Sequence, residues 1–348
     1  MRAALHRSHG AVDVLEIAEV AEPVVGPADV LVGVSYSALN RLDLLQRAGP
    51  ALVPGFSLPH VAGMDIAGEV VEAGADVDGF GVGDRVVVNP AVRCGRCAAC
   101  ARGEEMFCAA SRVLGANTPG GYAELVAVPA THVHHVPGHV DDLAAATIPT
   151  VFSTAWNGLF TTGGLRLGET VLIHAAGSGV STAAIQLAKH AGATVIATAG
   201  TEPKLEAAKR LGADVVVNNR TEDVLAAVAA ATDEGVDLVF DHVGPALFEL
   251  SLHALRPRGR LVFCGVTTGA RVSFDLPRVY QRGLRLLGSH SYSSADFGRM
   301  LAHCWTARFE AVIDSVYPLD QVAAAHERLA SGETIGKVVL EHERRYRP

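Results

Sequence analysis

The pattern of apolar and polar positions in this chain changes character partway along its 348 residues. The first third carries short, β-branched apolar runs separated by glycine and proline, among them residues 29–39, 65–74 and 83–90. Short runs of this kind, bounded by turn residues, are typical of β-strands. The pattern predicts a compact, mostly antiparallel β domain in this part of the chain.

From about Glu169 onward, apolar runs alternate with stretches of helical periodicity. Gly192 and Gly212 stand where helices would end, and Thr201 and Thr221 stand where helices would be capped. The predicted strands are 170–176, 194–200, 214–219, 236–244 and 260–265, and the predicted helices are 180–192, 202–213, 221–232 and 247–259. Such alternation predicts an α/β fold with a doubly wound parallel sheet.

The segment 319–343 has the pattern of one amphipathic helix, a glycine-containing turn and a strand. We expect this segment to pack back on the first domain.

Charge and composition narrow the class of protein. The chain has 29 basic and 37 acidic residues, a net charge of −8, with the acidic residues spread along it. This balance argues against partners such as nucleic acid or an anionic membrane surface. No apolar run approaches the ~18 residues that span a bilayer, and the amino terminus lacks the apolar segment of a signal peptide. The expected location is the cytoplasm, where clustered cysteines favour metal binding or reactivity over disulfides.

A turn rich in small residues, 175–184, follows the first strand of the predicted sheet. In a dinucleotide-binding fold such a turn lets the backbone approach the pyrophosphate, which then meets the amino terminus of the next helix. The G-x-G-x-x-G pattern is not intact, because its glycine positions hold Ala176, Ser178 and Ser181, although Gly177 and Gly179 supply flexibility. The context favours dinucleotide binding over a merely structural turn.

The end of the second strand of this sheet indicates which dinucleotide binds. An acidic residue there would hold the ribose 2′-hydroxyl of NAD and repel a 2′-phosphate. This chain has Gly200 and Thr201 at that point, with Lys204 just beyond and Arg220 after the third strand. These residues favour NADPH. The alternative is that Lys204 and Arg220 are ordinary surface charges.

Four of the six cysteines lie within one short segment, spaced C-x2-C-x2-C-x7-C: Cys94, Cys97, Cys100 and Cys108. Four thiolates can fill the tetrahedral shell of a zinc ion, which leaves no position for substrate, so the predicted zinc site is structural. An iron–sulfur cluster is less favoured, because that motif expects proline where Ala109 stands. Reduced cysteines without metal are the other alternative, and Cys264 and Cys304 are predicted to be small buried residues.

Taken together, several motifs resemble the medium-chain dehydrogenase/reductase superfamily, which includes zinc alcohol dehydrogenases and quinone oxidoreductases. The resemblance covers essentially the whole chain and is carried by four segments: 175–181 between strand and helix, the cysteine lobe 94–108, 63–87, and 336–340. It implies a GroES-like catalytic domain made of residues 1–150 and 288–348, with a Rossmann domain at 151–287. It also implies a homodimer or homotetramer acting on a small-molecule substrate.

The chain departs from the zinc alcohol dehydrogenases at the positions that hold their catalytic zinc. Where that group has Cys, His-Glu and a further Cys or Asp, this chain aligns Asn40, Met64 with Asp65, and Thr150. Met, Asn and Thr are poor zinc ligands. The pattern is similar to the zinc-free quinone-oxidoreductase branch. A rebuilt catalytic zinc site that uses the nearby His60 is the alternative.

Without a catalytic metal, the substrate itself must delocalise the negative charge that hydride transfer creates. An alkene conjugated to a carbonyl group, or a quinone, does this. The predicted function is therefore hydride transfer from NADPH to an enone, enoyl thioester or quinone. The alternatives are a zinc-dependent alcohol or carbonyl dehydrogenase with unusual ligands, a carbonyl reductase that uses only protein donors, and a non-catalytic NADPH-binding protein.

The resemblance also implies roles for individual residues. Asn40 and Thr154 would lie near the nicotinamide, and Tyr36 is a candidate proton donor, although Asn40 and Tyr36 also suit structural roles. The remaining cofactor-binding candidates are Ser178, Gly179 and Val180 at the pyrophosphate, Thr201 and Lys204 at the 2′-phosphate, Asn219 near the adenosine, and Val243, Gly265 and Lys337 along the cofactor cleft.

Overall fold

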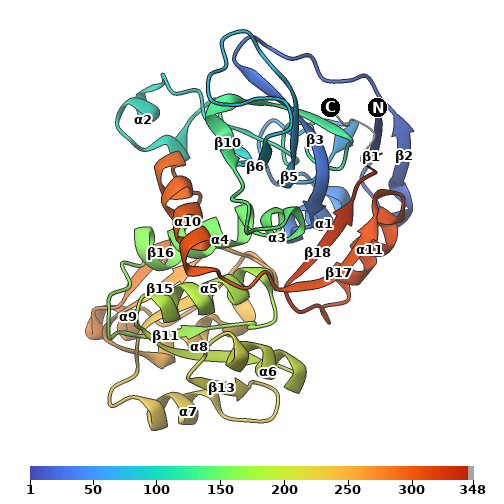
Figure 1. Cartoon of the computed structure of the whole chain (residues 1–348). Helices are drawn as coiled ribbons and strands as arrows, with labels where there is room; N and C mark the ends of the chain where they lie inside the picture. The colour runs from blue at the N-terminus through green and yellow to red at the C-terminus, as the bar shows by residue number, and fades with distance from the viewer. Residues whose placement is uncertain (344–348) are drawn as a thin grey trace. The chain divides into compact units, whose positions relative to one another are not determined.

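A computed structural model describes residues 1–343 of the chain (Figure 1). Contacts between residues divide the chain into two compact units. The first unit comprises Met1–Thr150 together with the chain from Ser293 onward, and the second is Val151–Tyr292. The segment 288–348 of the predicted catalytic domain ends in five residues, 344–348, that lie outside the described residues.

The first unit is built mainly of antiparallel strands drawn from both ends of the chain (Figure 1). Within residues 1–343, its larger sheet runs in the order β10 (Val133–His135), β6 (Arg85–Val88), β5 (Asp65–Ala73), β3 (Asp29–Ala38), β18 (Lys337–Glu341) and β17 (Ile313–Pro318), with β9 (Leu125–Pro129) also paired to β3. A smaller sheet joins β2 (Leu15–Glu19), β1 (Arg2–His6) and β4 (His60–Val61), and β7 (Ala91–Val92) pairs with β8 (Arg112–Val113). The predicted β-rich domain is confirmed.

Helices of the first unit are short, apart from one near its carboxyl-terminal end. They are α1 (Arg41–Ala48), α2 (Ala98–Ala101), α3 (Asp142–Ala146), α10 (Ser294–Ala307) and α11 (Val322–Ala330), with 3-10 turns η1 (Val12–Val14), η2 (Glu105–Phe107), η3 (Ala130–His132) and η5 (Leu319–Gln321). Strand β18 pairs antiparallel with β3, so that Val339 lies opposite Ala38. The carboxyl-terminal segment therefore packs on the first unit, as its pattern predicts.

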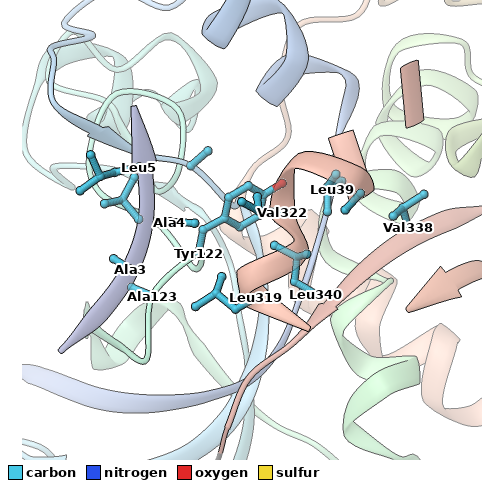
Figure 2. Close-up of a cluster of buried hydrophobic side chains, with 13 residues drawn as sticks. Ala3, Ala4, Leu5, Leu39, Tyr122, Ala123, Leu319, Val322, Val338 and Leu340 are labelled. Carbon is cyan, nitrogen blue, oxygen red and sulfur yellow. The ribbon is translucent and has the colours of Figure 1, made fainter. Parts of the chain in front are cut away.

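One core of the first unit lies between β1, α11 and β18. Its largest member is Tyr122, whose side chain is fully buried. Figure 2 shows the Tyr122 ring between Ala4 of β1 and Val322 of α11, with Leu39 and Leu340 beyond it. Each large apolar side chain buried in this way contributes about 1.5–3 kcal/mol. This core fixes the carboxyl-terminal helix and strand against the start of the chain.

The second unit is a parallel sheet with helices along the connections. Within the described residues, its strand order is β13 (Val215–Asn218), β12 (Thr194–Ala199), β11 (Thr170–Ile173), β14 (Val236–Asp241), β15 (Leu255–Phe263) and β16 (Arg285–Gly288), and every pairing is parallel. The helices are α4 (Pro149–Trp156), which begins in the first unit, the π-helical η4 (Asn157–Thr162), α5 (Gly179–His190), α6 (Glu202–Arg210), α7 (Val224–Ala231), α8 (Pro245–Ala254) and α9 (Leu276–Arg282). This 3-2-1-4-5-6 order is that of dinucleotide-binding sheets.

Two local predictions for the second unit were wrong. Asp223, not Thr221, caps α7, because its carboxylate accepts hydrogen bonds from the N–H groups of Leu225 and Ala226. Helix α8 ends at Ala254, and the following residues, including Pro257, already belong to β15. Proline disfavours a helical conformation in the residue before it and has no N–H for the helix, so the helix ends before Pro257.

Candidate functional site

The ammonium group of Lys337, the first residue of β18, is buried among three oxygen acceptors. Its Nζ donates to the Leu39 carbonyl oxygen at 2.6 Å, to Asn40 Oδ1 at 2.7 Å and to Asp65 Oδ2 at 2.8 Å. The exposed fraction of the side chain is 5% for Lys337 and 0% for Asp65. Three acceptors match the three N–H bonds of an ammonium group, so this buried charge is both paired and fully hydrogen-bonded.

Asp65 collects hydrogen bonds from three directions. It is the first residue of β5 and lies opposite Ala38 of β3. In addition to Lys337, its Oδ2 accepts from Asn40 Nδ2 at 3.0 Å, and its Oδ1 accepts from the backbone N–H of Thr150 at 2.7 Å. Thr150 lies in the first turn of α4, where a backbone N–H has no acceptor within the helix. The carboxylate therefore also stabilises the start of that helix.

Asn40 is placed by the helix that follows it. It is the N-cap residue of α1, with extended backbone angles, and its backbone N–H donates to Asp43 Oδ2 at 2.7 Å. Its side-chain amide faces Lys337 and Asp65, and Nδ2 also makes a longer contact of 3.4 Å with the Ala38 carbonyl. The residue predicted to act at the reacting end of the substrate is thus held by β3, β5 and β18 together.

A second buried carboxylate, Asp43, lies on the same helix. The Tyr122 hydroxyl donates to its Oδ2 at 3.0 Å, and within residues 1–343 its Oδ1 has no hydrogen-bond partner. Burial raises the pKa of Asp43 to about 6, and the hydrogen bonds from Asn40 and Tyr122 oppose that rise. Burial also raises the pKa of Tyr122, with Asp43 adding to the effect. Tyr122 therefore remains protonated as a donor at neutral pH.

The four positions aligned with catalytic zinc ligands do converge, but their chemistry does not fit a zinc ion. Asn40 and the backbone of Thr150 both donate to Asp65, and Met64 is buried with 6% of its surface exposed. The Lys337 ammonium lies 2.8 Å from the same carboxylate. A dication there would be repelled by the ammonium and would find a single good ligand. His60 does not complete a set, because among the described residues the four clustered cysteines are the only converging group of three or more potential His, Cys, Asp or Glu ligands.

The other two candidate catalytic residues lie outside this network. The Tyr36 hydroxyl donates to Glu341 Oε1 at 3.2 Å in a solvent-exposed pair between β3 and β18. Thr154 belongs to α4 within the second unit.

In the second unit, the predicted pyrophosphate turn is organised by hydroxyl groups and one imidazole. Ser178 is the N-cap of α5, and its Oγ accepts from the Ser181 N–H at 3.1 Å. His242 Nε2 lies 3.1 Å from Ser178 Oγ and 2.8 Å from Ser181 Oγ. Burial lowers the pKa of His242 to about 4, so the imidazole is neutral at pH 7. The first turn of α5, with Gly179 and Val180, presents N–H groups that have no acceptor within the helix.

A second imidazole, His174, is buried at the end of β11 beneath this turn. Its Nδ1 lies 3.0 Å from Thr198 Oγ1 and its Nε2 lies 3.0 Å from Ser251 Oγ. Its carbonyl oxygen accepts from Ser181 Oγ at 2.6 Å. Burial lowers the pKa of His174 to about 3, which makes it a neutral connector between the strands and the turn.

Two cationic side chains lie over the glycines that follow β11 and β12. A Cβ atom added to Gly177 would come within 2.7 Å of the Lys204 side chain, and one added to Gly200 would come within 2.6 Å of Arg220 Nε. Thr201 occupies the N-cap position of α6 but makes no capping hydrogen bond with its side chain. Lys204 and Arg220 are thus brought to the carboxyl ends of neighbouring parallel strands, where such sheets bind their ligands.

The remaining predicted cofactor residues follow the carboxyl ends of three strands. Asn219 comes after β13 and donates its backbone N–H to the Ala199 carbonyl at 3.0 Å, and Val243 comes after β14, where its N–H donates to Asp241 Oδ1 at 2.6 Å. Gly265 follows β15, and a Cβ atom there would collide with the His242 carbonyl group. All three lie in loops at one end of the sheet.

The four clustered cysteines form a compact group in the loop around α2 and η2. All four Sγ atoms lie within 4.8 Å of one another, and the individual separations include 3.5 Å for Cys94–Cys108 and 3.6 Å for Cys97–Cys100. Backbone N–H groups, first that of Cys100, lower the pKa of Cys97 to about 6. Four converging sulfur atoms suit a tetrahedral zinc ion.

The two remaining cysteines lie elsewhere in the chain. Cys304 is buried, as predicted, whereas Cys264, which was also predicted to be buried, is only partly buried.

Sequence reasoning did not find three members of these networks: Tyr122, His174 and His242. The two histidines could have been identified from the sequence, because each directly follows an apolar run that forms a buried strand of the parallel sheet. Nothing in the local sequence identifies Tyr122, because it contacts Asp43, 79 positions away, only in the folded protein.

Among residues 1–343, no helix is both long and apolar enough to cross a membrane.

Comparison with known proteins adds family information to this geometry. Residues 26–138 match the family model for the alcohol dehydrogenase GroES-like domain, and residues 179–306 match the model for zinc-binding dehydrogenases. The acryloyl-coenzyme A reductase of Metallosphaera sedula is 30% identical over 327 residues, which cover 93% of this chain and 96% of that protein.

Alcohol dehydrogenases are similar to the same extent. The NAD-dependent alcohol dehydrogenase of Sulfolobus acidocaldarius is 31% identical over 334 residues, covering 94% of this chain and 96% of that protein. A crystal structure described as NAD-dependent alcohol dehydrogenase superposes with a TM-score of 0.94 at 40% identity, covering 98% of this chain and 99% of that one.

Proposed function

This chain belongs to the medium-chain dehydrogenase/reductase superfamily, and from that premise we propose that it transfers hydride from NADPH to an alkene conjugated to a carbonyl group, or to a quinone. The family membership makes it an oxidoreductase that uses a nicotinamide cofactor. The choice of NADPH and of a conjugated acceptor is the proposal.

The buried group of Lys337, Asn40 and Asp65 carries this proposal. Asn40 and Asp65 stand at positions that align with catalytic zinc ligands of alcohol dehydrogenases, and Lys337 binds both of them. The group offers one carboxylate whose oxygens already accept three hydrogen bonds. A site with this donor set supplies no Lewis acid to an isolated ketone. An enoyl thioester, an enone or a quinone can be reduced without a Lewis acid, because it spreads the developing negative charge over its own conjugated system.

The proposed chemistry is a conjugate reduction. When bound, NADPH would supply a hydride to the β-carbon of the conjugated acceptor, and a proton taken from water would complete the reduction at the α-carbon. The products are NADP⁺ and the saturated thioester or ketone. We propose that the Asn40 side-chain amide donates a hydrogen bond to the acceptor's carbonyl oxygen, where negative charge develops. Its 3.4 Å contact with the Ala38 carbonyl is the weaker of the two contacts that Nδ2 donates, so this N–H is the easier one to turn toward a substrate.

Relatives support two different acceptors. The Metallosphaera sedula relative is named for reducing acryloyl-coenzyme A, which favours a conjugated thioester. The Sulfolobus acidocaldarius relative is named an NAD-dependent alcohol dehydrogenase, which makes alcohol oxidation the second candidate. The first is favoured here because the Lys337 ammonium binds Asn40 and Asp65, which stand at two of the aligned metal positions.

The proposed NADPH preference depends on Lys204 and Arg220. Both lie over glycines at the ends of β11 and β12, and the segment after β12 begins with Gly200 and Thr201 instead of an acidic residue. A Lys204→Ala variant should raise KM for NADPH by about 10- to 100-fold, as expected for one charge-assisted hydrogen bond, and leave KM for NADH nearly unchanged. Lys209→Ala, on the exposed side of the same helix, is the matched control. Equal effects on both cofactors would contradict the assignment.

We propose one zinc ion per chain, bound by the four clustered cysteines and confined to holding their loop. Its chemistry there is structural, because a shell filled by four thiolates has no position for substrate. The Cys97→Ser variant should lose this zinc. Metal analysis should give about one zinc per chain for the parent protein and much less for the variant.

A substrate panel with metal analysis tests the reaction itself. Purified protein is assayed with acryloyl- and crotonyl-coenzyme A, simple enones, quinones, ketones and alcohols, with and without a chelator. Reduction of conjugated acceptors at about one zinc per chain supports the proposal. Alcohol oxidation that requires a second zinc would favour the dehydrogenase instead, and ketone reduction that survives chelation would indicate a metal-free carbonyl reductase. NADPH binding with no turnover of any substrate would indicate a binding protein.

Asn40→Ala tests the assigned residue. Turnover should fall by more than cofactor affinity does, because the amide is proposed to act on the substrate. Unchanged turnover would remove Asn40 from the mechanism.

A further inference from the structure

Two serine hydroxyls and the imidazole of His242 meet at the turn between β11 and α5. Ser181 Oγ lies 2.6 Å from the His174 carbonyl oxygen and 2.8 Å from His242 Nε2. Ser178 Oγ lies 3.1 Å from the same Nε2 and 3.2 Å from Ser181 Oγ. A hydroxyl has a single hydrogen and a carbonyl oxygen only accepts, so these distances determine which atom carries each hydrogen.

Ser181 determines which nitrogen of His242 carries a hydrogen. Its hydroxyl donates to the His174 carbonyl, because two oxygen atoms at 2.6 Å repel each other unless a hydrogen lies between them. Only lone pairs of Ser181 Oγ are then left to face Nε2, so Nε2 must be the donor across their 2.8 Å contact. Burial keeps the His242 ring neutral near pH 7 by lowering its pKa to about 4, so the ring is the Nε2–H tautomer.

The Ser178 hydroxyl keeps a hydrogen that the protein does not use at short range. Its Oγ accepts from the Ser181 backbone N–H at 3.1 Å, and the Nε2–H of His242 approaches it at 3.1 Å. With Nε2 as a donor, the acceptor that remains among the described residues is Ser181 Oγ at 3.2 Å. Ordinary O–H···O hydrogen bonds measure about 2.5–3.0 Å, so this contact is a weak one.

The donors at this turn fit the pyrophosphate of a nicotinamide dinucleotide. Ser178 is half-buried and is the N-cap of α5, and the next two residues, Gly179 and Val180, offer N–H groups that have no acceptor within the helix. Anions bind to such groups at helix amino termini. Because two N–H groups already face the lone pairs of Ser178 Oγ, its hydrogen is free to turn toward the same anion.

From this arrangement we propose that His242 is a positioning residue for cofactor binding. Its Nε2–H occupies the acceptor side of Ser178 Oγ, so that the Ser178 hydroxyl donates to a pyrophosphate oxygen of the nicotinamide dinucleotide. His242 acts through Ser178 and needs no contact with the cofactor. The inference rests on the use of a nicotinamide dinucleotide in the proposed function, and not on the hydride acceptor or on the choice between NADPH and NADH.

Imidazole nitrogen chemical shifts, measured by NMR on isotope-labelled parent protein, test the tautomer. The signals of His242 are those that disappear in the His242→Gln variant. We expect Nε2 to carry the hydrogen at pH 7 and Nδ1 to be unprotonated. An Nδ1–H tautomer or a charged imidazolium at this pH overturns the proposal.

Cofactor affinity, measured by fluorescence titration without substrate, tests the role of each side chain. Ser178→Ala should raise Kd by about 10-fold, as expected for one hydrogen bond to a charged group. His242→Met should raise Kd by a similar factor, whereas His242→Gln, whose amide can place an N–H near the position of Nε2, should stay close to the parent. Thr182→Val is the matched control, because the Thr182 hydroxyl already donates to the Gly179 carbonyl at 2.8 Å.

The double variant Ser178→Ala/His242→Met separates positioning from a merely structural role. It should bind the dinucleotide no more weakly than Ser178→Ala alone, because His242 is proposed to act through Ser178. Additive losses, an unchanged Kd in Ser178→Ala or His242→Met, or a His242→Gln variant as weak as His242→Met overturn the proposal. If His242→Met does not fold, the tautomer in the parent protein and the Kd of Ser178→Ala still decide.

These measurements are independent of the substrate panel, because no hydride acceptor is present. A parent protein that binds a dinucleotide without the expected pattern among the variants overturns this inference alone. A parent protein that binds neither NADPH nor NADH overturns the proposed function as well.

Discussion

Two buried polar groups, one in each unit, are held in different ways. In the first unit, Lys337 and Asp65 form an ion pair at 2.8 Å that is almost fully removed from solvent. In the second unit, the neutral imidazole of His174 lies between the hydroxyl groups of Thr198 and Ser251. Removing one member of the first arrangement leaves a buried charge, whereas removing one member of the second leaves an unpaired neutral nitrogen. The Lys337–Asp65 pair should therefore be far more sensitive to a single substitution than the His174 group is.

The largest effect is expected from Lys337→Met. The substitution keeps the length of the side chain but leaves Asp65 charged and buried, which should lower the free energy of unfolding by about 3–5 kcal/mol. Chemical denaturation measures this loss. Lys189→Met is the control, because it breaks a surface ion pair with Asp214 that is similarly short and should cost at most about 1 kcal/mol.

The double variant Lys337→Met/Asp65→Asn separates charge from packing. Removal of both charges should recover a large part of the stability lost in Lys337→Met, since no uncompensated ion remains. A double variant as unstable as the single one would show that the ammonium acts through its packing instead.

A somewhat smaller effect is expected from Asp43→Asn, and it should depend on pH. Because the pKa of Asp43 is raised from 3.8 to about 6 in the folded protein, folding favours its protonated form. The stabilisation is complete below about pH 4 and is lost as the pH rises toward 6. Asn cannot titrate, so the stability of the variant relative to the parent should increase by about 2 kcal/mol between pH 4 and pH 6.5. Denaturation curves at several pH values measure this difference, and parallel pH profiles would contradict it.

The smallest effect in this series is expected in the second unit, from Ser251→Ala. It removes the partner of His174 Nε2 and leaves a neutral nitrogen buried, at a cost of about 1–3 kcal/mol. The stability of this variant relative to the parent should not change between pH 5 and pH 8, since the pKa of His174 is about 3 in the parent protein. A loss as large as that of Lys337→Met would remove the contrast between the two units.

Much of the fold could be predicted from local patterns. The alternation of apolar runs and helices after Glu169 predicts the parallel sheet, because its central strands β11, β12 and β14 are buried along most of their length and therefore read as continuous apolar runs. The cysteine spacing predicts the compact sulfur group, because all four ligands lie within fifteen residues of chain. The elements of the parallel sheet and the cysteine group both depend on residues that are close together along the chain.

The polar network of the first unit could be predicted only in part. Asn40, Asp65 and Lys337 were recognised as separate candidates, but nothing in the sequence indicates that the amine contacts both of the other two, across 297 and 272 positions. Tyr122 was not recognised, because its significance depends on the partner that it has once buried. Pairings of this range come from the packed fold and not from any local pattern.

The pairing of β18 with β3 has a consequence for how the chain folds during synthesis. Strand β3 ends at Ala38, yet the lysine that bonds to Leu39 is translated 298 positions later. A ribosome therefore releases the whole parallel-sheet unit before the amino-terminal sheet can be completed. We expect the parallel-sheet unit of the nascent polypeptide to fold first. The edge of β3 stays unpaired until β18 has been synthesised and can pair with it.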